Sequence, residues 1–197
     1  GIVGMGRIGR AVGRIGAGFG MEVVYLRRGG RLPAEEVADG VESAWRHAGD
    51  LTRLLSSSDV VTVHVPLSGA TRHLIGRAEL AAMKPGAILV NTARGPVVDE
   101  AGLVEALRAG RLRGAGLDVC EREPELSAGL AELPNVVLLP HLGSATEETR
   151  RRMAEYAARN AIGAVFGEEG VHIVNPEVTA SAPRWHGRPP DGVPFWR

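Results

Sequence analysis

The stretch Gly1-Ile2-Val3-Gly4-Met5-Gly6-Arg7-Ile8-Gly9, at the start of the sequence, decides the fold. Residues 1–3 are typical of the end of a short buried strand, and a helical pattern begins directly after the glycines. The glycines between them have the spacing G-x-G-x-x-G. A glycine-rich turn without a ligand is the alternative, since the chain contains 27 glycines. The strand before the motif and the helix after it favour dinucleotide binding.

A physical requirement explains why each position of this motif is a glycine. Gly4 lets the chain turn sharply out of the strand, and Gly6, which has no side chain, lets a pyrophosphate approach the backbone. Gly9 lets the helix lie close to the sheet. The first N–H groups of the helix are unpaired and its dipole is positive there, so a phosphate is expected to bind at this point.

The rest of the chain alternates short apolar segments with helical ones. The predicted strands cover residues 23–26, 60–65, 87–91, 115–119 and 136–139. The predicted helices cover residues 8–19, 51–55, 79–83, 100–108 with Asp99 as the N-cap, and 144–166, which starts with a capping box in Ser144-Ala145-Thr146-Glu147. This alternation predicts an α/β fold with a doubly wound parallel sheet. Together with the glycine motif, it predicts a Rossmann-type domain that binds NAD(P).

Composition narrows the class of protein. The formal net charge is zero, so nothing favours binding to nucleic acid or to an anionic membrane. Cys120 is the single cysteine, which rules out an internal disulfide and fits a reducing cytoplasm. No apolar run is long enough to span a bilayer. We therefore predict a cytoplasmic protein with no nucleic-acid partner, no membrane partner and no metal site.

Three side chains with acid–base or anion-binding chemistry follow three of the predicted strands. Arg94 follows strand 87–91, Glu123 follows strand 115–119, and His141 follows strand 136–139. Taken singly, each is better explained as a surface arginine, a solvated carboxylate or a loop histidine. Because ligands bind beyond the carboxyl ends of the strands in open α/β sheets, their convergence predicts a catalytic site. Cys120 is better explained as a small buried residue than as a nucleophile.

The end of the second predicted strand bears on the choice of cofactor. Leu26 occupies the position where an enzyme that uses NAD places an acidic residue to bind the ribose 2′-hydroxyl. Arg27 and Arg28 follow directly, and guanidinium groups bind phosphate well. A solvated basic turn is the alternative. The absence of the acid together with the arginines predicts NADP as the preferred cofactor over NAD.

Several stretches match a known protein family, in the family's own order. They are Gly4-Met5-Gly6-Arg7-Ile8-Gly9, Ser58-Asp59-Val60 with His64-Val65-Pro66-Leu67, Thr71-Arg72-His73-Leu74-Ile75, Met83-Lys84-Pro85-Gly86-Ala87, Asn91-Thr92-Ala93-Arg94-Gly95, Gly116-Leu117-Asp118-Val119 with Glu123-Pro124, and Pro140-His141-Leu142-Gly143-Ser144-Ala145-Thr146. Over residues 1 to about 176 the chain resembles the D-isomer-specific 2-hydroxyacid dehydrogenases, close to the glyoxylate and hydroxypyruvate reductases.

The resemblance implies an oxidoreductase that transfers hydride between NAD(P)H and a small 2-oxo or 2-hydroxy acid. It implies that Arg94 binds the substrate carboxylate, that His141 donates the proton and that Glu123 holds the imidazole. Asp118 is expected to position the nicotinamide side. The residues expected to bind cofactor, from the motifs and the resemblance together, are Gly4, Gly6, Arg7, Ile8, Gly9, Arg27, Arg28, Val65, Pro66, Thr71, Thr92, Ala93, Arg94, Asp118, His141 and Gly143.

The resemblance also bears on domain organisation. Most of the family's substrate domain precedes the glycine motif, so we expect this chain to be a fragment that largely lacks it. The expected parts are a dinucleotide-binding domain at 1–172, a remnant of the substrate domain at 173–179 and an irregular tail, rich in proline and glycine, at 180–197. In the family, dimers form through the nucleotide domain, largely across the helix that matches the one after Asp99 and its neighbours, so the resemblance implies a homodimer.

Two other functions remain open at this point. The transcriptional corepressors that bind at C-termini share this fold and much of the motif set, which makes a nucleotide-sensing interaction protein the first alternative. The second is a catalytically incomplete fragment that binds cofactor and turns over substrate poorly. Arg94, Glu123 and His141 are all present, which favours an enzyme over an inactive remnant.

Overall fold

The computed structural model describes residues 1–33, 37, 41–166, 172 and 174. These residues fall into two compact units, of which the first spans Gly1–Gly143 and the second begins at Ser144. Every residue expected to act in catalysis or cofactor binding lies in the first unit. The expected remnant of the substrate domain at 173–179 and the expected tail at 180–197 lie, Val174 apart, outside the described residues.

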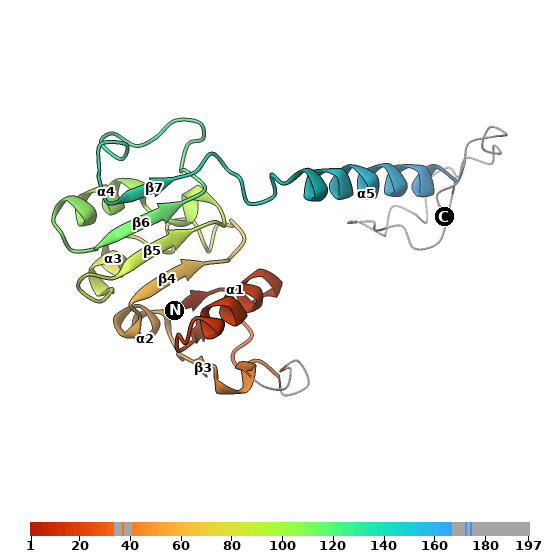
Figure 1. Cartoon of the computed structure of the whole chain (residues 1–197). Helices are drawn as coiled ribbons and strands as arrows, with labels where there is room; N and C mark the ends of the chain where they lie inside the picture. The colour runs from red at the N-terminus through yellow and green to blue at the C-terminus, as the bar shows by residue number, and fades with distance from the viewer. Residues whose placement is uncertain (34–36, 38–40, 167–171, 173, 175–197) are drawn as a thin grey trace. The chain divides into compact units, whose positions relative to one another are not determined.

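Seven strands form one parallel sheet in the order β3-β2-β1-β4-β5-β6-β7 (Figure 1). The strands are β1 (Ile2–Val3), β2 (Val24–Leu26), β3 (Arg46–His47), β4 (Val60–Val63), β5 (Ile88–Asn91), β6 (Gly114–Leu117) and β7 (Val136–Leu138). From β1 the chain builds outward to β3 and then crosses to β4 on the other side of β1. The strand order reverses there, and open α/β sheets bind ligands at such a switch point.

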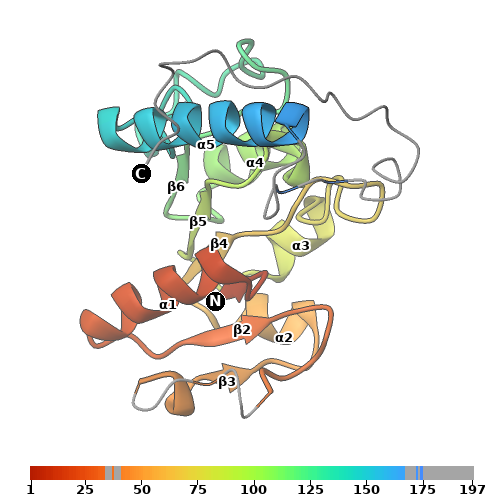
Figure 2. The same ribbon diagram turned by 90° about the vertical axis from the view of Figure 1, so that its right-hand side faces the viewer.

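Helices cover both faces of this sheet (Figure 2). They are α1 (Arg7–Gly18), α2 (Leu51–Ser57), α3 (Arg77–Ala82) and α4 (Glu100–Arg108), with short 3-10 turns at η2 (Val41–Ala44) and η3 (Gly95–Val97). On one face α2, α3 and α4 pack in a row, each against the next, and α1 covers the other face. The predicted doubly wound parallel sheet is therefore confirmed.

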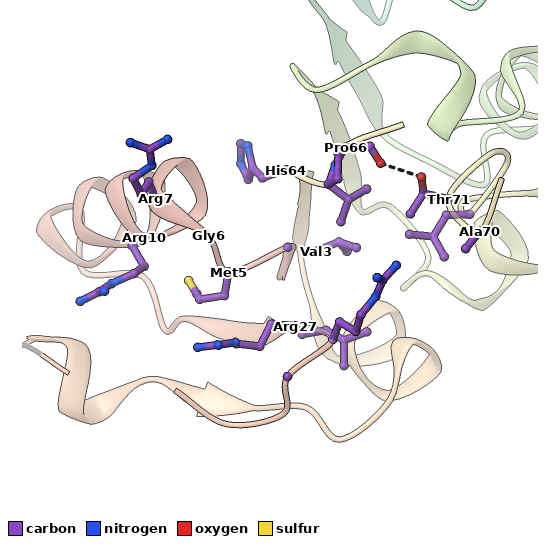
Figure 3. A pocket seen from close by; sticks show the side chains of 16 residues that line it. Val3, Met5, Gly6, Arg7, Arg10, Arg27, His64, Pro66, Ala70 and Thr71 are labelled. Carbon is purple, nitrogen blue, oxygen red and sulfur yellow. Dashed lines mark hydrogen bonds between the residues drawn. The ribbon is translucent and has the colours of Figure 1, made fainter. Parts of the chain in front are cut away.

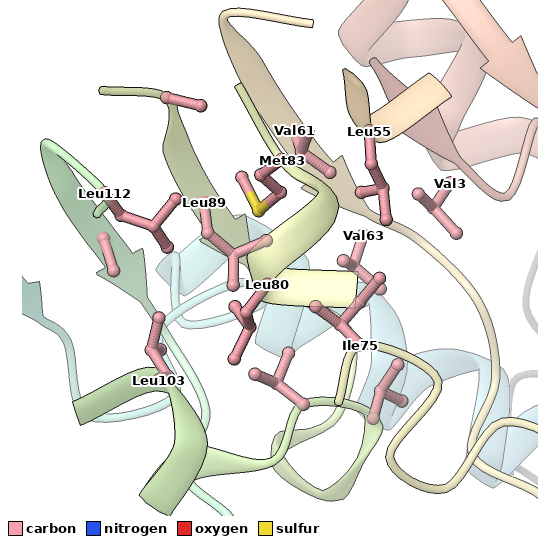
Figure 4. Close-up of a cluster of buried hydrophobic side chains, with 14 of the residues drawn as sticks. Val3, Leu55, Val61, Val63, Ile75, Leu80, Met83, Leu89, Leu103 and Leu112 are labelled. Atoms are coloured by element: carbon pink, nitrogen blue, oxygen red, sulfur yellow. The ribbon is translucent and has the colours of Figure 1, made fainter. Parts of the chain in front are cut away.

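The sheet separates two hydrophobic clusters, because successive side chains of a strand point to opposite faces. In β1, Val3 belongs to the large cluster and its neighbour Ile2 to the small one. The large cluster includes leucines of α2, α3 and α4, and Figure 4 shows its members Leu55, Leu80 and Leu103. The small cluster is completed by α1 through Ala17. These clusters fix the helices against the strands whose carboxyl ends carry the candidate site.

The strand predictions need correction at β3, at the end of β4 and at the end of β6, where the strand predicted at 115–119 stops at Leu117. β3 is not among the predicted strands, because Arg46–His47 is short and polar and has no apolar run. The sheet creates this strand through main-chain bonds, from Arg46 N to Val23 O at 3.0 Å and from Ala48 N to Tyr25 O at 2.9 Å. The strand predicted at 60–65 ends at Val63. His64 and Val65 therefore leave the ladder and are available to a site.

The described part of the second unit contains α5 (Glu147–Phe166). The predicted capping box at Ser144 is wrong in position, because Thr146 caps the helix. Its hydroxyl accepts from Thr149 N at 3.1 Å, and its carbonyl accepts from Arg150 N at 3.0 Å. In the described part of the chain, no helix is both long and apolar enough to cross a membrane.

Candidate active site

The glycine motif has the geometry of a phosphate-binding turn. Gly4 has a φ of 101°, and a Cβ atom there would lie 2.5 Å from the carbonyl oxygen of His64. A Cβ at Gly9 would collide with the carbonyl oxygen of Gly4, whereas Gly6 faces open space. The first turn of α1 has no side-chain cap and no acidic residue. Its N–H groups are therefore presented to an anion, as expected from the motif.

A cleft of about 810 Å³ lies at the switch point of the sheet. Its volume is within the range of sites for small molecules and cofactors. It is lined by Val3, Gly4, Met5, Gly6, Arg7, Arg10, Leu26, Arg27, Arg28, Gly29, His64, Val65, Pro66, Ala70, Thr71 and Leu74. Eight of the residues expected to bind cofactor meet here: Gly4, Gly6, Arg7, Arg27, Arg28, Val65, Pro66 and Thr71.

The walls of this cleft are basic. Arg7 and Arg10 come from α1, and Arg27 and Arg28 follow the end of β2. Figure 3 shows Arg10 and Arg27 extending in the same direction from these two elements. None of the residues that line the cleft in the described part of the chain is acidic. The cleft is thus suited to a ligand with several negative charges.

Arg10 is a cleft residue that the sequence analysis missed. Its guanidinium NH2 lies 2.7 Å from Glu42 Oε2, and Arg14 NH2 lies 2.5 Å from the other carboxylate oxygen. Glu42 is buried, so it holds both arginines against η2. The signal in the sequence is the position of Arg10 directly after the third glycine of the motif, on the exposed start of the helix.

His64 is a second cleft residue that the sequence analysis missed. It follows β4 directly, and its Nε2 lies 2.9 Å from the hydroxyl of Thr62. Burial lowers the pKa of His64, so its imidazole is neutral at neutral pH. Opposite, the Thr71 hydroxyl donates to Pro66 O at 2.6 Å and accepts from Ser68 N at 2.8 Å (Figure 3). These bonds shape the loop that closes the cleft.

The other residues expected to bind cofactor do not line this cleft. Ile8 is exposed on the first turn of α1, and Gly9 is buried in the same turn. Thr92 and Ala93 follow β5, and Asp118 follows β6. Gly143 ends the first unit. Except for Ile8 and Gly9, they gather beyond β5, β6 and β7, next to the residues expected to be catalytic.

His141 and Glu123 are brought together although they are 18 positions apart. His141 Nδ1 donates to Glu123 Oε2 at 3.0 Å, because a carboxylate oxygen only accepts. Glu123 Oε1 accepts from Cys120 N at 3.1 Å. The bond with His141 is the main cause that lowers the pKa of Glu123, and the positive charge of Arg94 adds to it. Glu123 is therefore ionised at neutral pH and orients the imidazole.

Asp118 holds the turn that carries His141. Asp118 is 5 % exposed, and its two carboxylate oxygens accept from Leu142 N at 2.7 Å and from Gly143 N at 2.8 Å. Its carbonyl oxygen accepts from His141 N at 2.9 Å. His141 has a positive φ of 56°, which is uncommon for a residue with a side chain. The bonds to Asp118 stabilise this backbone conformation.

Arg94 lies on a turn that Asn91 organises. The buried amide of Asn91 accepts from Ala93 N and donates to Arg94 O, both at 3.0 Å. The Arg94 side chain is exposed. A Cβ atom at the next residue, Gly95, would collide with the carbonyl group of Cys120. This close approach explains why the turn with Arg94 packs against the segment that leads to Glu123.

A smaller cavity of about 360 Å³ lies beside His141 and Glu123. It is lined by Asp118, Cys120, Glu123, Pro124, Leu126, Leu138, Leu139, Pro140 and His141. Cys120 is half-buried. Burial, together with the charges of Glu100 and Glu123, raises the pKa of its thiol. A thiolate is therefore scarce at neutral pH, which fits the expectation that Cys120 is not a nucleophile.

A phosphate-binding glycine turn at the switch point of a doubly wound parallel sheet defines the Rossmann class of dinucleotide-binding domains. Residues 1–143 match the family described as D-isomer specific 2-hydroxyacid dehydrogenase, NAD binding domain. The chain belongs to this family, and the resemblance drawn from its motifs is confirmed. The matched residues coincide with the first compact unit, which contains the cleft and the hydrogen-bonded pair of His141 and Glu123. Its cofactor is thus a nicotinamide dinucleotide.

Curated relatives carry the names of reductases. A glyoxylate reductase of Thermococcus litoralis is 48 % identical over 183 residues, which are 93 % of this chain and 54 % of that protein. A glyoxylate/hydroxypyruvate reductase B of Pectobacterium carotovorum is 51 % identical over 180 residues, with shares of 90 % and 54 %. The chain thus spans about half the length of these relatives.

The chain is also similar to solved structures of reductases. A glyoxylate reductase from Paecilomyes thermophila superposes with a TM-score of 0.78 at 41 % identity, covering 87 % of this chain and 50 % of that one. An NADPH-dependent glyoxylate/hydroxypyruvate reductase from Sinorhizobium meliloti, solved with NADP and malonate, superposes with a TM-score of 0.74 at 36 % identity, covering 82 % and 48 %.

Proposed function

We propose that this chain supplies the cofactor-binding and proton-transfer part of a reductase. The reaction transfers hydride between a nicotinamide cofactor and a small 2-oxo acid of the glyoxylate or hydroxypyruvate type. The hydrogen bond of 3.0 Å between His141 and Glu123, with Arg94 on an adjacent loop, carries the proposal. The names of the relatives support the choice of substrate. A cytoplasmic location and a homodimer belong to the same proposal.

In this proposal His141 is the general acid. Its Nδ1–H is held by Glu123, which leaves Nε2 to give a proton to the developing alkoxide of the substrate. Arg94 binds the substrate carboxylate through its planar fork and polarises the neighbouring carbonyl. When bound, the nicotinamide ring supplies the hydride.

The residues of the glycine turn fit the cofactor. Gly6 offers space beside the backbone for a pyrophosphate, and the start of α1 has neither a side-chain cap nor an acid. In the proposal, Arg7 and Ile8 approach the pyrophosphate and Pro66 and Thr71 contact the cofactor from the loop after β4. Thr92, Ala93, Asp118 and Gly143 surround its nicotinamide end.

We further propose a preference for NADP over NAD. Leu26 pairs with Val3 at the carboxyl end of β2, so the position that would bind a ribose 2′-hydroxyl carries an aliphatic side chain. Arg27 and Arg28 follow it in the cleft wall. Their guanidinium groups attract a 2′-phosphate. The relative from Sinorhizobium meliloti, described as NADPH-dependent, supports this choice.

The proposed reaction is tested with the full-length enzyme that contains this domain. Oxidation of NADPH is followed with glyoxylate, with hydroxypyruvate and with no acid added, at saturating cofactor. Consumption that depends on either acid supports the proposal. A full-length protein that binds NADPH tightly, yet reduces neither acid, contradicts it and favours a nucleotide-sensing role.

A further inference from the structure

The turn that carries Glu123 has little support from its own side chains. Residues 122–126 are all exposed, and even Leu126 is 41 % exposed. Within the turn, Glu125 N donates to Arg122 O at 2.9 Å. Because no side chain of these residues is buried, the position of the turn depends on how its two ends are held.

A single buried carboxylate holds both ends. Glu100, the first residue of α4, is 3 % exposed. Its Oε2 accepts from Glu121 N at 2.7 Å, and its Oε1 accepts from Ser127 N at 2.7 Å. Hydrogen bonds to an ionised group are shorter and stronger than those between neutral groups. The positive end of the α4 dipole further stabilises the negative charge.

The same contacts extend to the two neighbouring loops. Glu100 N donates in return to Glu121 Oε2 at 3.3 Å, and Glu121 Oε1 lies 2.7 Å from His73 Nε2. His73 N donates to Pro96 O at 2.8 Å, in the turn that follows Arg94. The network therefore joins the loop after β4, the loop after β5 and the turn with Glu123.

We propose that Glu100 is a positioning residue for Glu123. By binding residues 121 and 127 with one carboxylate, it keeps the Glu123 side chain within hydrogen-bond distance of His141. Glu100 lines neither the large cleft nor the smaller cavity, so it acts through the turn and not through a ligand. The importance of Glu100 for catalysis rests on the proposed function, whereas its effect on the position of Glu123 does not.

Glu100→Gln tests the inference in the 197-residue chain. An amide has one acceptor oxygen, so one of the two backbone N–H groups, of Glu121 or of Ser127, loses its partner. Hydrogen exchange at that amide is expected to become about ten- to hundredfold faster, from the strength of a bond to a charged group. The pKa of Glu123 is expected to rise toward its ordinary value, because the bond from His141 that lowers it breaks more often. Amide exchange and a carboxyl titration by NMR measure the two effects.

Glu105→Gln is the matched control, since Glu105 is exposed on the same helix and pairs with Arg77. It is expected to change neither measurement. If the amides of Glu121 and Ser127 exchange at unchanged rates in Glu100→Gln, Glu100 does not hold the two ends of the turn. If one of them exchanges faster but the pKa of Glu123 is unchanged, Glu100 does not position Glu123. A purely structural role would lower the melting temperature without moving that pKa.

If Glu100→Gln does not fold, amide exchange in the unmodified chain tests the inference. The amides of Glu121 and Ser127 are then expected to exchange at least about tenfold more slowly than the amide of Leu126, because a bond to a charged group protects them, whereas the Leu126 N–H has no acceptor among the described residues. Equal exchange at these amides overturns the inference. No readout requires cofactor or substrate, so a failure here is distinct from a failure of the proposed reductase activity.

Discussion

At the residue scale, the pair of His141 and Glu123 has the most direct chemical consequence. His141→Asn keeps a polar side chain but removes the titrating group. In the full-length enzyme kcat is expected to fall by about 10²–10⁴, the usual contribution of a positioned general acid. The control is His172→Asn, because His172 is exposed and lines neither the cleft nor the smaller cavity; it is expected to leave kcat unchanged. Wild-type turnover in His141→Asn, measured by NADPH oxidation with glyoxylate, contradicts the assignment.

The proposed preference for NADP also depends on single residues. Arg27→Ala removes a guanidinium from the cleft wall, and a hydrogen bond to a charged group contributes about 1.5–3 kcal/mol. The affinity for NADPH is therefore expected to fall about ten- to hundredfold, while NADH binding stays nearly unchanged. Fluorescence titration of the chain with each cofactor measures this.

Arg53→Ala is the control for this titration, because Arg53 is an exposed arginine of α2 that pairs with Asp50. It is expected to affect neither cofactor. If the unmodified chain binds NADH as tightly as NADPH, or more tightly, the proposed preference is wrong.

At the scale of elements, the close approach of two loops positions Arg94 relative to Glu123. Gly95→Ala places a methyl group against the carbonyl of Cys120, and overpacking of this kind costs about 1–3 kcal/mol. The melting temperature is expected to fall, as measured by circular dichroism. Gly18→Ala is the control, because a Cβ at this helical glycine meets nothing within 4 Å. A Gly95→Ala chain as stable as the Gly18→Ala chain would show that the loops separate freely.

At the scale of the whole molecule, the chain is expected to form a homodimer through the exposed face of α4. Sedimentation at tens of micromolar, a generous concentration for an obligate interface, is expected to give the mass of two chains. Ala101→Arg adds charge to the exposed side of that helix and is expected to yield monomers, whereas Arg53→Ala on α2 is not. A monomeric unmodified chain contradicts the proposal.

Much of the fold could be predicted from the sequence because its signals are local. The glycine spacing of Gly4, Gly6 and Gly9 needs no distant contact to be recognised, and alternating apolar segments specify strands and helices one at a time. Prediction is weaker where two local signals compete, as at Ser144 and Thr146, which could both cap α5. It fails for β3, since Arg46–His47 becomes a strand only through pairing with β2.

For the site, the sequence by itself determined which chemical groups are present and that they follow the carboxyl ends of parallel strands. It also determined the family, because the motifs occur together and in order. Only the tertiary structure decided which groups meet: Glu123 with His141, Asp118 with the backbone of 142 and 143, and Glu100 with both ends of the turn at 121–127. It likewise revealed Arg10 and His64 in the cleft wall. The physical reason is that hydrogen-bond partners and cavity walls depend on distances between residues that are far apart in the chain.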